Sequence, residues 1–308
     1  MSLSKKTLKY LNKNCPCDLS GKTVVVTGAN SGIGFKTAEI LLYLSARVIM
    51  ACRNIGKAED AKNALLKDYP HAEIAIYKLD LARLKSIDAF VTELQENGED
   101  IYCFINNAGV FRQPNKKTGD GLEMVAGTNF IGTYYLTEKI IPLMLNGKGQ
   151  KCVINTVSVV YKNAKNYPDD IYCEKKYGNF KVYARSKLAL VRYTEYLAEK
   201  YKDTDLKVFM THPGISMTEI SLNAYGKIIY KLAKALSFLF NSVEKSALGT
   251  AYVLSHKLQS GDLIGPSGLF NIAGYPKPNR INGKAFSYTQ ETVDFAADQT
   301  QKIIKGEI

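Results

Sequence analysis

Short apolar runs alternate with longer amphipathic segments along most of the chain. The runs are rich in β-branched residues, as in Thr23-Val24-Val25-Val26, which is typical of strands buried on both faces of a parallel sheet. Between them, apolar residues recur at helical spacing. The pattern predicts strands at Lys22–Thr27, Arg47–Ala51, Glu73–Lys78, Ile101–Ile105, Lys151–Val157 and Leu206–Met210. It predicts helices at Phe35–Ser45, Lys57–Lys67, Leu84–Asn97, Gly121–Leu145, Tyr183–Tyr201 and Tyr288–Lys302.

This unbroken alternation of strand and helix predicts an α/β fold with a right-handed, doubly wound parallel sheet of the Rossmann type. No internal repeat or break in composition marks a second domain. We expect residues 1–20 to form an N-terminal extension and residues 21–308 to form one domain. A helical substrate lid is expected at about 215–245, because in Ile220–Phe240 the apolar positions share one helix face and the lysines group on another.

A glycine-rich loop follows the first predicted strand and leads directly into a helix. It reads Thr27-Gly28-Ala29-Asn30-Ser31-Gly32-Ile33-Gly34. In this order Gly28 permits a tight turn, Gly32 lets the backbone approach a pyrophosphate, and Gly34 lets helix and strand pack closely. The pyrophosphate would then face the positive end of the helix. The loop predicts a dinucleotide site, and a plain strand-to-helix turn is the alternative.

The end of the second predicted strand indicates which dinucleotide binds. Folds that prefer NAD place Asp or Glu near this point to hold both ribose hydroxyls. No acidic residue lies between Leu44 and Arg53. Arg53, followed by Asn54, can instead pair with a 2′-phosphate. We therefore predict NADP(H) over NAD(H), the alternative being that Arg53 merely ends a strand in solvent.

Tyr183 and Lys187 lie four residues apart on one predicted helix, so they share a face. A cationic ammonium beside a phenol favours the phenolate, and Tyr183 would then exchange a proton well below its reference pKa of about 10. This spacing recurs by chance on many helices, so the pair gains weight only from the motifs upstream. Asp80 and Asn106 lie at carboxyl ends of predicted strands, where sheets of this kind bind ligands. As loop residues they could also be turn formers.

Together, the motifs resemble the short-chain dehydrogenase/reductase family from about Lys22 to Ala273. The resemblance implies that Asp80 of Asp80-Leu81 holds the adenine ring, that Asn106–Gly109 steadies the central sheet, and that Pro213-Gly214 with Thr218 borders the nicotinamide. The implied cofactor-binding residues are Gly28, Asn30, Ser31, Gly32, Ile33, Gly34, Arg53, Asn54, Asp80, Leu81, Asn107, Ala108, Gly109, Tyr183, Lys187, Pro213, Gly214 and Thr218.

The resemblance also implies a catalytic tetrad of Asn129, Ser158, Tyr183 and Lys187. Tyr183 would be the general acid in reduction and the general base in oxidation. Lys187 would lower the pKa of that tyrosine and hold the nicotinamide ribose. Ser158 would hydrogen-bond the substrate oxygen. Asn129 would hold a water that links Lys187 to bulk solvent, the alternative being a mid-helix Asn bonded to the backbone.

A narrower similarity is to the retinol dehydrogenase-like branch, which includes protochlorophyllide reductase-like enzymes. It rests on Ala51-Cys52-Arg53-Asn54, on residues 129–137, on Ser186-Lys187-Leu188-Ala189 and on the long gap between Ser158 and Tyr183. This likeness implies an NADP(H)-dependent enzyme acting on an apolar carbonyl or alcohol, such as an aldehyde, a ketone or a retinoid- or steroid-like compound. One departure is that Asn30 and Ser31 stand where many NADP-using members carry a second basic residue.

Composition adds constraints on partners and location. The balance of 41 basic to 29 acidic residues suits a phosphate-rich cofactor, a nucleic acid or a membrane surface, but the basic residues are scattered, so no nucleic-acid partner is expected. The six Cys are dispersed, and Cys15-Pro16-Cys17 has no second ligand pair, so reduced thiols and no metal are expected. Residues 1–11 lack the apolar core of a signal peptide, and no long apolar run indicates a spanning helix.

These features predict a cytoplasmic enzyme whose lid could touch a membrane surface peripherally. A homo-oligomer is compatible with the resemblance, because many relatives pair through the two helices that carry Asn129 and Tyr183. The alternative function is a non-catalytic NADP(H)-sensing regulatory protein on the same fold, since fold alone never proves chemistry. The complete tetrad argues against a sensor, which has no use for a proton relay. Substrate identity, reaction direction and stereochemistry are not predicted.

Overall fold

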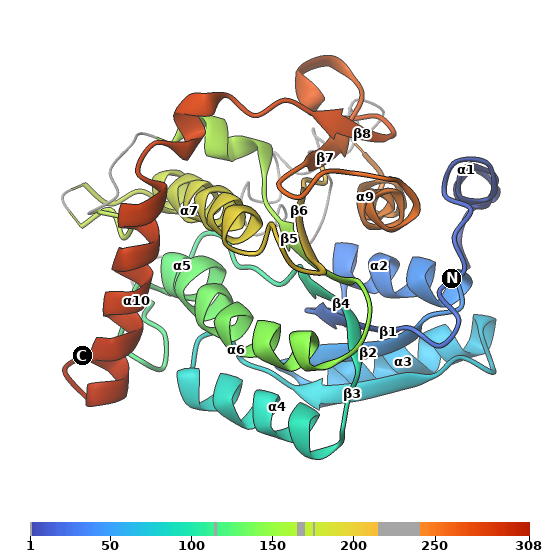
Figure 1. Cartoon of the computed structure of the whole chain (residues 1–308), viewed down its shortest axis with the longest axis horizontal. Helices are drawn as coiled ribbons and strands as arrows, with labels where there is room; N and C mark the ends of the chain where they lie inside the picture. The colour runs from blue at the N-terminus through green and yellow to red at the C-terminus, as the bar shows by residue number, and fades with distance from the viewer. Residues whose placement is uncertain (1, 114–115, 165–169, 175, 215–240) are drawn as a thin grey trace, which may run out of the picture.

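The computed structural model describes residues 2–113, 116–164, 170–174, 176–214 and 241–308. Within these ranges eight strands form one sheet, in the order β3-β2-β1-β4-β5-β6-β7-β8. Neighbouring strands from β3 to β7 pair in parallel, and β8 pairs antiparallel with β7. Figure 1 shows this sheet between layers of helices. The predicted doubly wound, Rossmann-type fold is confirmed.

The strands are β1 (Thr23–Thr27), β2 (Arg47–Cys52), β3 (Ile74–Lys78), β4 (Ile101–Asn106), β5 (Lys151–Thr156), β6 (Leu206–Thr211), β7 (Leu263–Pro266) and β8 (Pro276–Asn279). The α-helices are α1 (Lys5–Asn14), α2 (Gly32–Tyr43), α3 (Ile55–Asp68), α4 (Leu84–Glu96), α5 (Met124–Ala126), α6 (Thr133–Asn146), α7 (Asn179–Lys200), α9 (Val243–Ser255) and α10 (Thr289–Lys305). The other turns are the π-helical η1 (Gly127–Gly132) and the 3₁₀ turns η2 (Val159–Asn163), η4 (Leu269–Asn271) and η5 (Gly283–Phe286).

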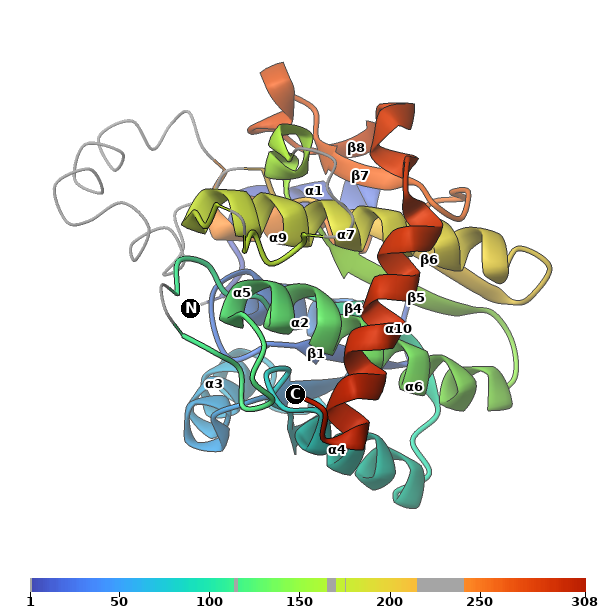
Figure 2. The same ribbon diagram turned by 90° about the vertical axis from the view of Figure 1, so that its left-hand side faces the viewer.

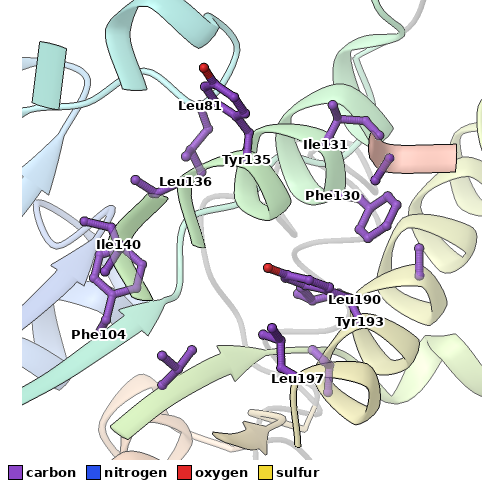
Figure 3. Close-up of a cluster of buried hydrophobic side chains, with 14 of the residues drawn as sticks. Leu81, Phe104, Phe130, Ile131, Tyr135, Leu136, Ile140, Leu190, Tyr193 and Leu197 are labelled. Carbon is purple, nitrogen blue, oxygen red and sulfur yellow. The ribbon is translucent and has the colours of Figure 1, made fainter. Parts of the chain in front are cut away.

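Two apolar clusters hold the helices to the two faces of the sheet. In β1, Val25 belongs to one cluster, while Val24 and Val26 belong to the other, as the alternation of side chains along a strand requires. The first cluster joins the sheet to α4, α6 and α7, and Figure 3 shows part of it, including Phe104 of β4 and Leu190 of α7. The second cluster joins the sheet to α1, α2, α3 and α9. Helix α10 packs across α7 and α6 (Figure 2).

The predicted boundaries differ from the structure at specific places. The six predicted strands match within one residue at each end, but β7 and β8 were not predicted, because they are short and contain proline. Helix α2 begins three residues before the predicted Phe35, since the last turn of the glycine loop is already helical. Helix α7 begins at Asn179, four residues before Tyr183. Residues 1–20 contain α1, which packs on α9.

The prediction of one continuous α-helix over Gly121–Leu145 is wrong. The helix begins at Met124, and the π-helical turn η1 separates α5 from α6. A π-turn inserts an extra residue into the helical repeat, which apolar spacing alone does not reveal. The turn lies in a crowded place, because a Cβ on Gly132 would sit 2.0 Å from the carbonyl oxygen of Leu81. Asn129 therefore lies in a widened turn.

The predicted lid lies almost wholly outside the described residues. Only its last part is described, where Ser242 caps α9 and Val243 begins it. Thr218 is likewise outside the described residues. Among the helices of the ranges described above, none is both long enough and apolar enough to cross a membrane.

Candidate active site

The strand order places a crevice between β1 and β4, where the direction of chain progression reverses. The loops after these two strands are fastened to each other at this point. The Thr27 hydroxyl accepts hydrogen bonds from the backbone N–H groups of Asn107 and Ala108, both at 2.9 Å. The side-chain amide of Asn107 donates to the Thr27 carbonyl, also at 2.9 Å. These three hydrogen bonds hold the two loops in fixed positions at the entrance of the crevice.

The glycine loop fills this mouth in a conformation that side chains would prevent. Gly28 has a φ of +67°, in the left-handed region that favours glycine. A Cβ on Gly34 would lie 2.3 Å from the Gly28 carbonyl oxygen and 2.5 Å from the Asn107 amide nitrogen. Ser31 is the N-cap of α2, but its side chain makes no capping bond. The loop can therefore approach a ligand with its backbone N–H groups.

Substituting Gly34 tests this packing. Gly34→Ala is expected to destabilise the fold by about 1–3 kcal/mol, because its methyl group would overlap backbone atoms that cannot move aside. The matched control is Gly56→Ala in α3, where the added Cβ would meet only the Asn54 side chain, at 3.6 Å. That change is expected to stabilise the fold by about 0.5–1 kcal/mol. Chemical denaturation of both variants is the measurement, and equal stability would contradict the steric argument.

A cleft of about 510 Å³ opens at the carboxyl ends of these strands. Its lining contains every predicted cofactor-binding residue except Gly214, whose neighbour Pro213 is included, and Thr218, which is not described. It also contains residues that the sequence reasoning missed: Ala51, Lys57, Leu79, Val110, Phe111, Gln113, Thr128, Thr156 and Val157. Several of these residues lie at the ends of strands, and the rule that strand ends line the crevice would have predicted them. No sequence pattern predicts Phe111 and Gln113, which lie on either side of Arg112, a residue with a φ of +52°.

Lys187 lies at the inner wall of the cleft. Its side chain is buried, and its ammonium donates to the Thr156 carbonyl oxygen at 2.8 Å. Burial lowers the pKa of Lys187 from 10.5 to about 8, so the group is still mostly cationic at pH 7. Its Nζ is 5.9 Å from the centre of the Tyr183 ring. Helix α7 thus presents a cation and a phenol side by side to the cleft.

The Tyr183 ring is held by an aromatic contact. Phe111 meets it edge-on, with ring centres 4.8 Å apart and planes at 74°. Edge-to-face pairs of this kind stabilise by about 0.5–1.5 kcal/mol beyond their buried area. Because Phe111 also lines the cleft, it both supports the tyrosine and forms an apolar wall beside it.

Asn129 is tied to the chain opposite rather than to its own helix. Its Oδ1 accepts from the Val110 backbone N–H at 2.7 Å, and its Nδ2 donates to the Val110 carbonyl at 2.8 Å. Asn129 is thus bonded to backbone, as the alternative interpretation expected, but to the backbone of Val110 and not to that of its own helix. Asn129 nevertheless lies next to the proposed catalytic lysine: a Cβ on Gly109 would be 3.2 Å from Asn129 Oδ1 and 3.8 Å from Lys187 Nζ.

Ser158 lies two residues after the end of β5. It is half-buried, and its carbonyl accepts from the backbone N–H of Tyr161 at 3.0 Å. Its hydroxyl does not cap the η2 turn that it begins. Neither Ser158 nor Asn129 is among the residues that line the cleft, although their neighbours Val157 and Thr128 are. The structure therefore brings Tyr183 and Lys187 to the cleft itself and the other two residues to its border.

A buried polar network sets α6 and α7 against the sheet. The Asn106 amide donates to Thr137 of α6 at 2.9 Å and to Asn155 of β5 at 2.8 Å. Asn155 donates in turn to Thr194 of α7 at 2.9 Å. Since α6 continues from the turn that carries Asn129, and α7 carries Tyr183, this network relates both to the strands that line the cleft.

Comparisons with known proteins agree with this geometry. A family model described as short chain dehydrogenase matches residues 22–225. Human retinol dehydrogenase 14 is 34% identical over 266 residues, covering 82% of this chain and 78% of its own. Human retinol dehydrogenase 12 is 37% identical over 202 residues, covering 66% of this chain and 64% of its own. The chain belongs to the short-chain dehydrogenase/reductase family of oxidoreductases, and within it to the retinol dehydrogenase-like branch.

Solved structures share the fold. An uncharacterised protein from Mycobacterium paratuberculosis has a TM-score of 0.75 and 26% identity, with 92% of this chain and 95% of that chain covered. L-sorbose reductase from Gluconobacter frateurii, solved with NADPH and L-sorbose, has a TM-score of 0.63 and 19% identity, with 78% and 91% covered. At that identity the second likeness concerns the fold alone.

Proposed function

We propose that the protein is an NADP(H)-dependent oxidoreductase that interconverts apolar carbonyl compounds and alcohols. The observation that carries the proposal is a single cleft that unites the glycine loop, a basic end at Arg53 and the Tyr183–Lys187 pair. The glycine cradle suits a pyrophosphate, since Gly28, Gly32 and Gly34 line the cleft at the N-terminal end of α2 with backbone and no side chains. A bound nicotinamide would supply the hydride.

The choice of NADP(H) over NAD(H) rests on two cations. Arg53 follows β2 and lines the cleft. Lys57 lines it too, from the first turn of α3, where its backbone N–H donates to the capping Asn54 side chain at 2.9 Å. Two basic side chains at one end of the cleft suit the added charge of a 2′-phosphate. Lys57 thereby makes up for the basic residue that the glycine loop lacks.

In the proposed reaction Tyr183 gives a proton to the carbonyl oxygen during reduction and takes it back during oxidation. The adjacent Lys187 charge favours the phenolate and would hold the nicotinamide ribose. Ser158 would hydrogen-bond the substrate oxygen from the border of the cleft. The role proposed for Asn129 is to hold a proton-relay water beside Lys187. The water would bind to the parts of the Asn129 amide that its two hydrogen bonds with Val110 leave open.

An apolar substrate is proposed because the wall beside Tyr183 is apolar. Val110, Phe111 and Val157 all line this part of the cleft. The similarity to retinol dehydrogenases supports the same class of substrate. A panel of aliphatic aldehydes, ketones and retinoids, assayed by NADPH oxidation, tests this part of the proposal. Turnover of polar sugars in preference to all apolar compounds would contradict it.

Cofactor choice is tested by fluorescence titration of NADPH and NADH. Arg53→Ala and Lys57→Ala are each expected to weaken NADPH binding by about 10- to 100-fold, the usual worth of a charge-assisted hydrogen bond. NADH binding should change little, because NADH has no 2′-phosphate. Lys67→Ala, an exposed lysine at the far end of α3, is the matched control. Equal affinity for both cofactors, unchanged in the variants, would remove the basis for NADP(H).

A further inference from the structure

The segment after β6 is fastened by buried polar groups from distant parts of the chain. Pro213, which lines the cleft, has a carbonyl that accepts from the Asn241 amide at 3.1 Å and from the Ser246 hydroxyl at 3.0 Å. Asn241 Oδ1 in turn accepts from the backbone N–H of Gly274 at 2.9 Å. The cleft wall at Pro213 is thus anchored to the start of α9 and to the loop before β8.

His212 sits at the centre of this arrangement. It is 4% exposed, and its Nδ1 accepts from the backbone N–H of Gly214 at 3.3 Å. A side chain that accepts from the N–H two residues further on closes a turn in the way that Asn does in an Asx-turn. Its Nε2 lies 3.0 Å from the amide nitrogen of Asn279 in β8. One imidazole therefore joins the segment after β6 to the edge strand of the sheet.

These contacts determine the tautomer of the ring. Because Nδ1 receives a hydrogen bond, the neutral imidazole must carry its proton on Nε2. An Nε2–H cannot face an amide NH₂, so the Asn279 amide is better turned with its oxygen toward His212. That orientation also gives a donor to Asn279 Oδ1, which otherwise is a buried oxygen without a partner among the described residues.

The backbone around His212 is closely packed. A Cβ on Gly265 of β7 would lie 2.1 Å from His212 Nε2. Gly214 has a φ of +74°, and a Cβ there would lie 2.1 Å from the Ile272 carbonyl oxygen. Burial, with a smaller contribution from the nearby Lys162 charge, lowers the pKa of His212 to about 4. The ring is accordingly neutral at pH 7.

We propose that His212 is a positioning residue: its Nε2–H tautomer locks the Pro213–Gly214 segment to Asn279 and so sets the cleft wall against which a nicotinamide would rest. The effect that His212 is expected to have on turnover rests on the proposed function. The effect should fall on the geometry of hydride transfer more than on cofactor affinity, because misplacing a wall by about 1 Å can lower the rate about 100-fold.

The tautomer is tested directly by ¹⁵N NMR of the histidine rings. The chain has three His, and the His212 signals are assigned by their loss in His212→Asn. We expect a neutral ring with its proton on Nε2 throughout pH 5 to 8. A proton on Nδ1, or titration of the ring near its ordinary pKa of about 6.5, would overturn the proposal. This readout needs no turnover, so it stands apart from any failure of the proposed function.

Two variants of His212 separate its two hydrogen bonds. His212→Asn can still accept from the Gly214 N–H but cannot reach Asn279, whereas His212→Phe loses both bonds. We expect kcat to fall about 10- to 100-fold in His212→Phe and to recover in part in His212→Asn, with NADPH affinity changed much less. His71→Phe, at an exposed histidine, is the control. Equal kcat in all four proteins would overturn the proposal.

Asn279→Asp tests the partner without removing the ring. The carboxylate keeps an acceptor opposite the Nε2–H, so the variant should fold and turn over substrate. Its negative charge should raise the pKa of His212, and the acid limb of the kcat profile should move to higher pH. Had the amide nitrogen been the true partner, a carboxylate facing a lone pair would destabilise the fold. An unfolded variant, or an unshifted pH profile, would overturn the proposal.

Discussion

Tyr183→Phe is expected to lower kcat by about 100- to 10,000-fold, the usual contribution of general acid–base catalysis. The phenol oxygen is the group proposed to deliver and receive the proton, and the substitution removes only that oxygen. The ring, which Phe111 holds edge-on at 4.8 Å, remains in place. NADPH affinity should therefore change little, which separates loss of chemistry from loss of binding.

The measurement is single-turnover oxidation of bound NADPH with the best substrate of the panel, alongside an NADPH titration. Tyr196→Phe is the matched control, because Tyr196 is a half-buried tyrosine on the same helix that does not line the cleft. It should retain the activity of the unmodified protein. Retained activity in Tyr183→Phe would show that another group moves the proton.

Lys187→Met is expected to abolish turnover while stabilising the protein without cofactor at pH 7. The ammonium is buried, and its pKa of about 8 lies below the usual 10.5, so burying the cation costs on the order of 3 kcal/mol. Met removes that cost but leaves the Thr156 carbonyl without its donor. The expected net gain is therefore about 1–3 kcal/mol. The lysine would be a residue kept for function at the expense of stability.

The sign of the pH dependence follows from the depressed pKa. Below pH 8 both folded and unfolded states carry the proton, and the full cost is present. Between about pH 8 and 10.5 the unfolded state binds more protons than the folded state, so the stability of the unmodified protein rises with pH. The advantage of Lys187→Met should shrink over this interval.

Urea denaturation at pH 7 and pH 10 measures this difference, since other titrating groups cancel between the two proteins. Lys181→Met, at an exposed lysine of the same helix, should show no such pH-dependent gap. A gap that stays constant or widens with pH would mean that Lys187 is not buried as a cation.

Local patterning predicted most of the fold. Strands such as Thr23–Thr27 consist of β-branched residues buried on both faces, and such runs can be recognised without knowledge of their neighbours. The same reasoning missed β7 and β8 and the π-helical turn around Asn129. Those features depend on pairing with another strand, or on the backbone of Leu81 and Val110 close by, and neither is encoded in local spacing.

The candidate site likewise contains features that local sequence predicts and features that it does not. The glycine loop, Arg53 and the Tyr183–Lys187 pair could be predicted, because each lies in a short motif whose turn, strand end or helix face is formed by nearby residues. The Phe111–Tyr183 and His212–Asn279 contacts depend on segments far apart in sequence. Lys57 lies only four residues after Arg53, but its place in the cleft depends on where helix α3 begins.

The sequence by itself thus determined the fold class, the glycine-rich loop between β1 and α2 and the chemical identity of the proposed proton-transfer pair. Only the tertiary structure decided that Lys187 is buried against Thr156, that Asn129 is bound to Val110, and that the cleft has a second cation at one end and an aromatic wall at Tyr183. The physical reason is that a motif specifies which groups are present, whereas burial, hydrogen-bond partners and pKa are set by neighbours that fold in from elsewhere in the chain.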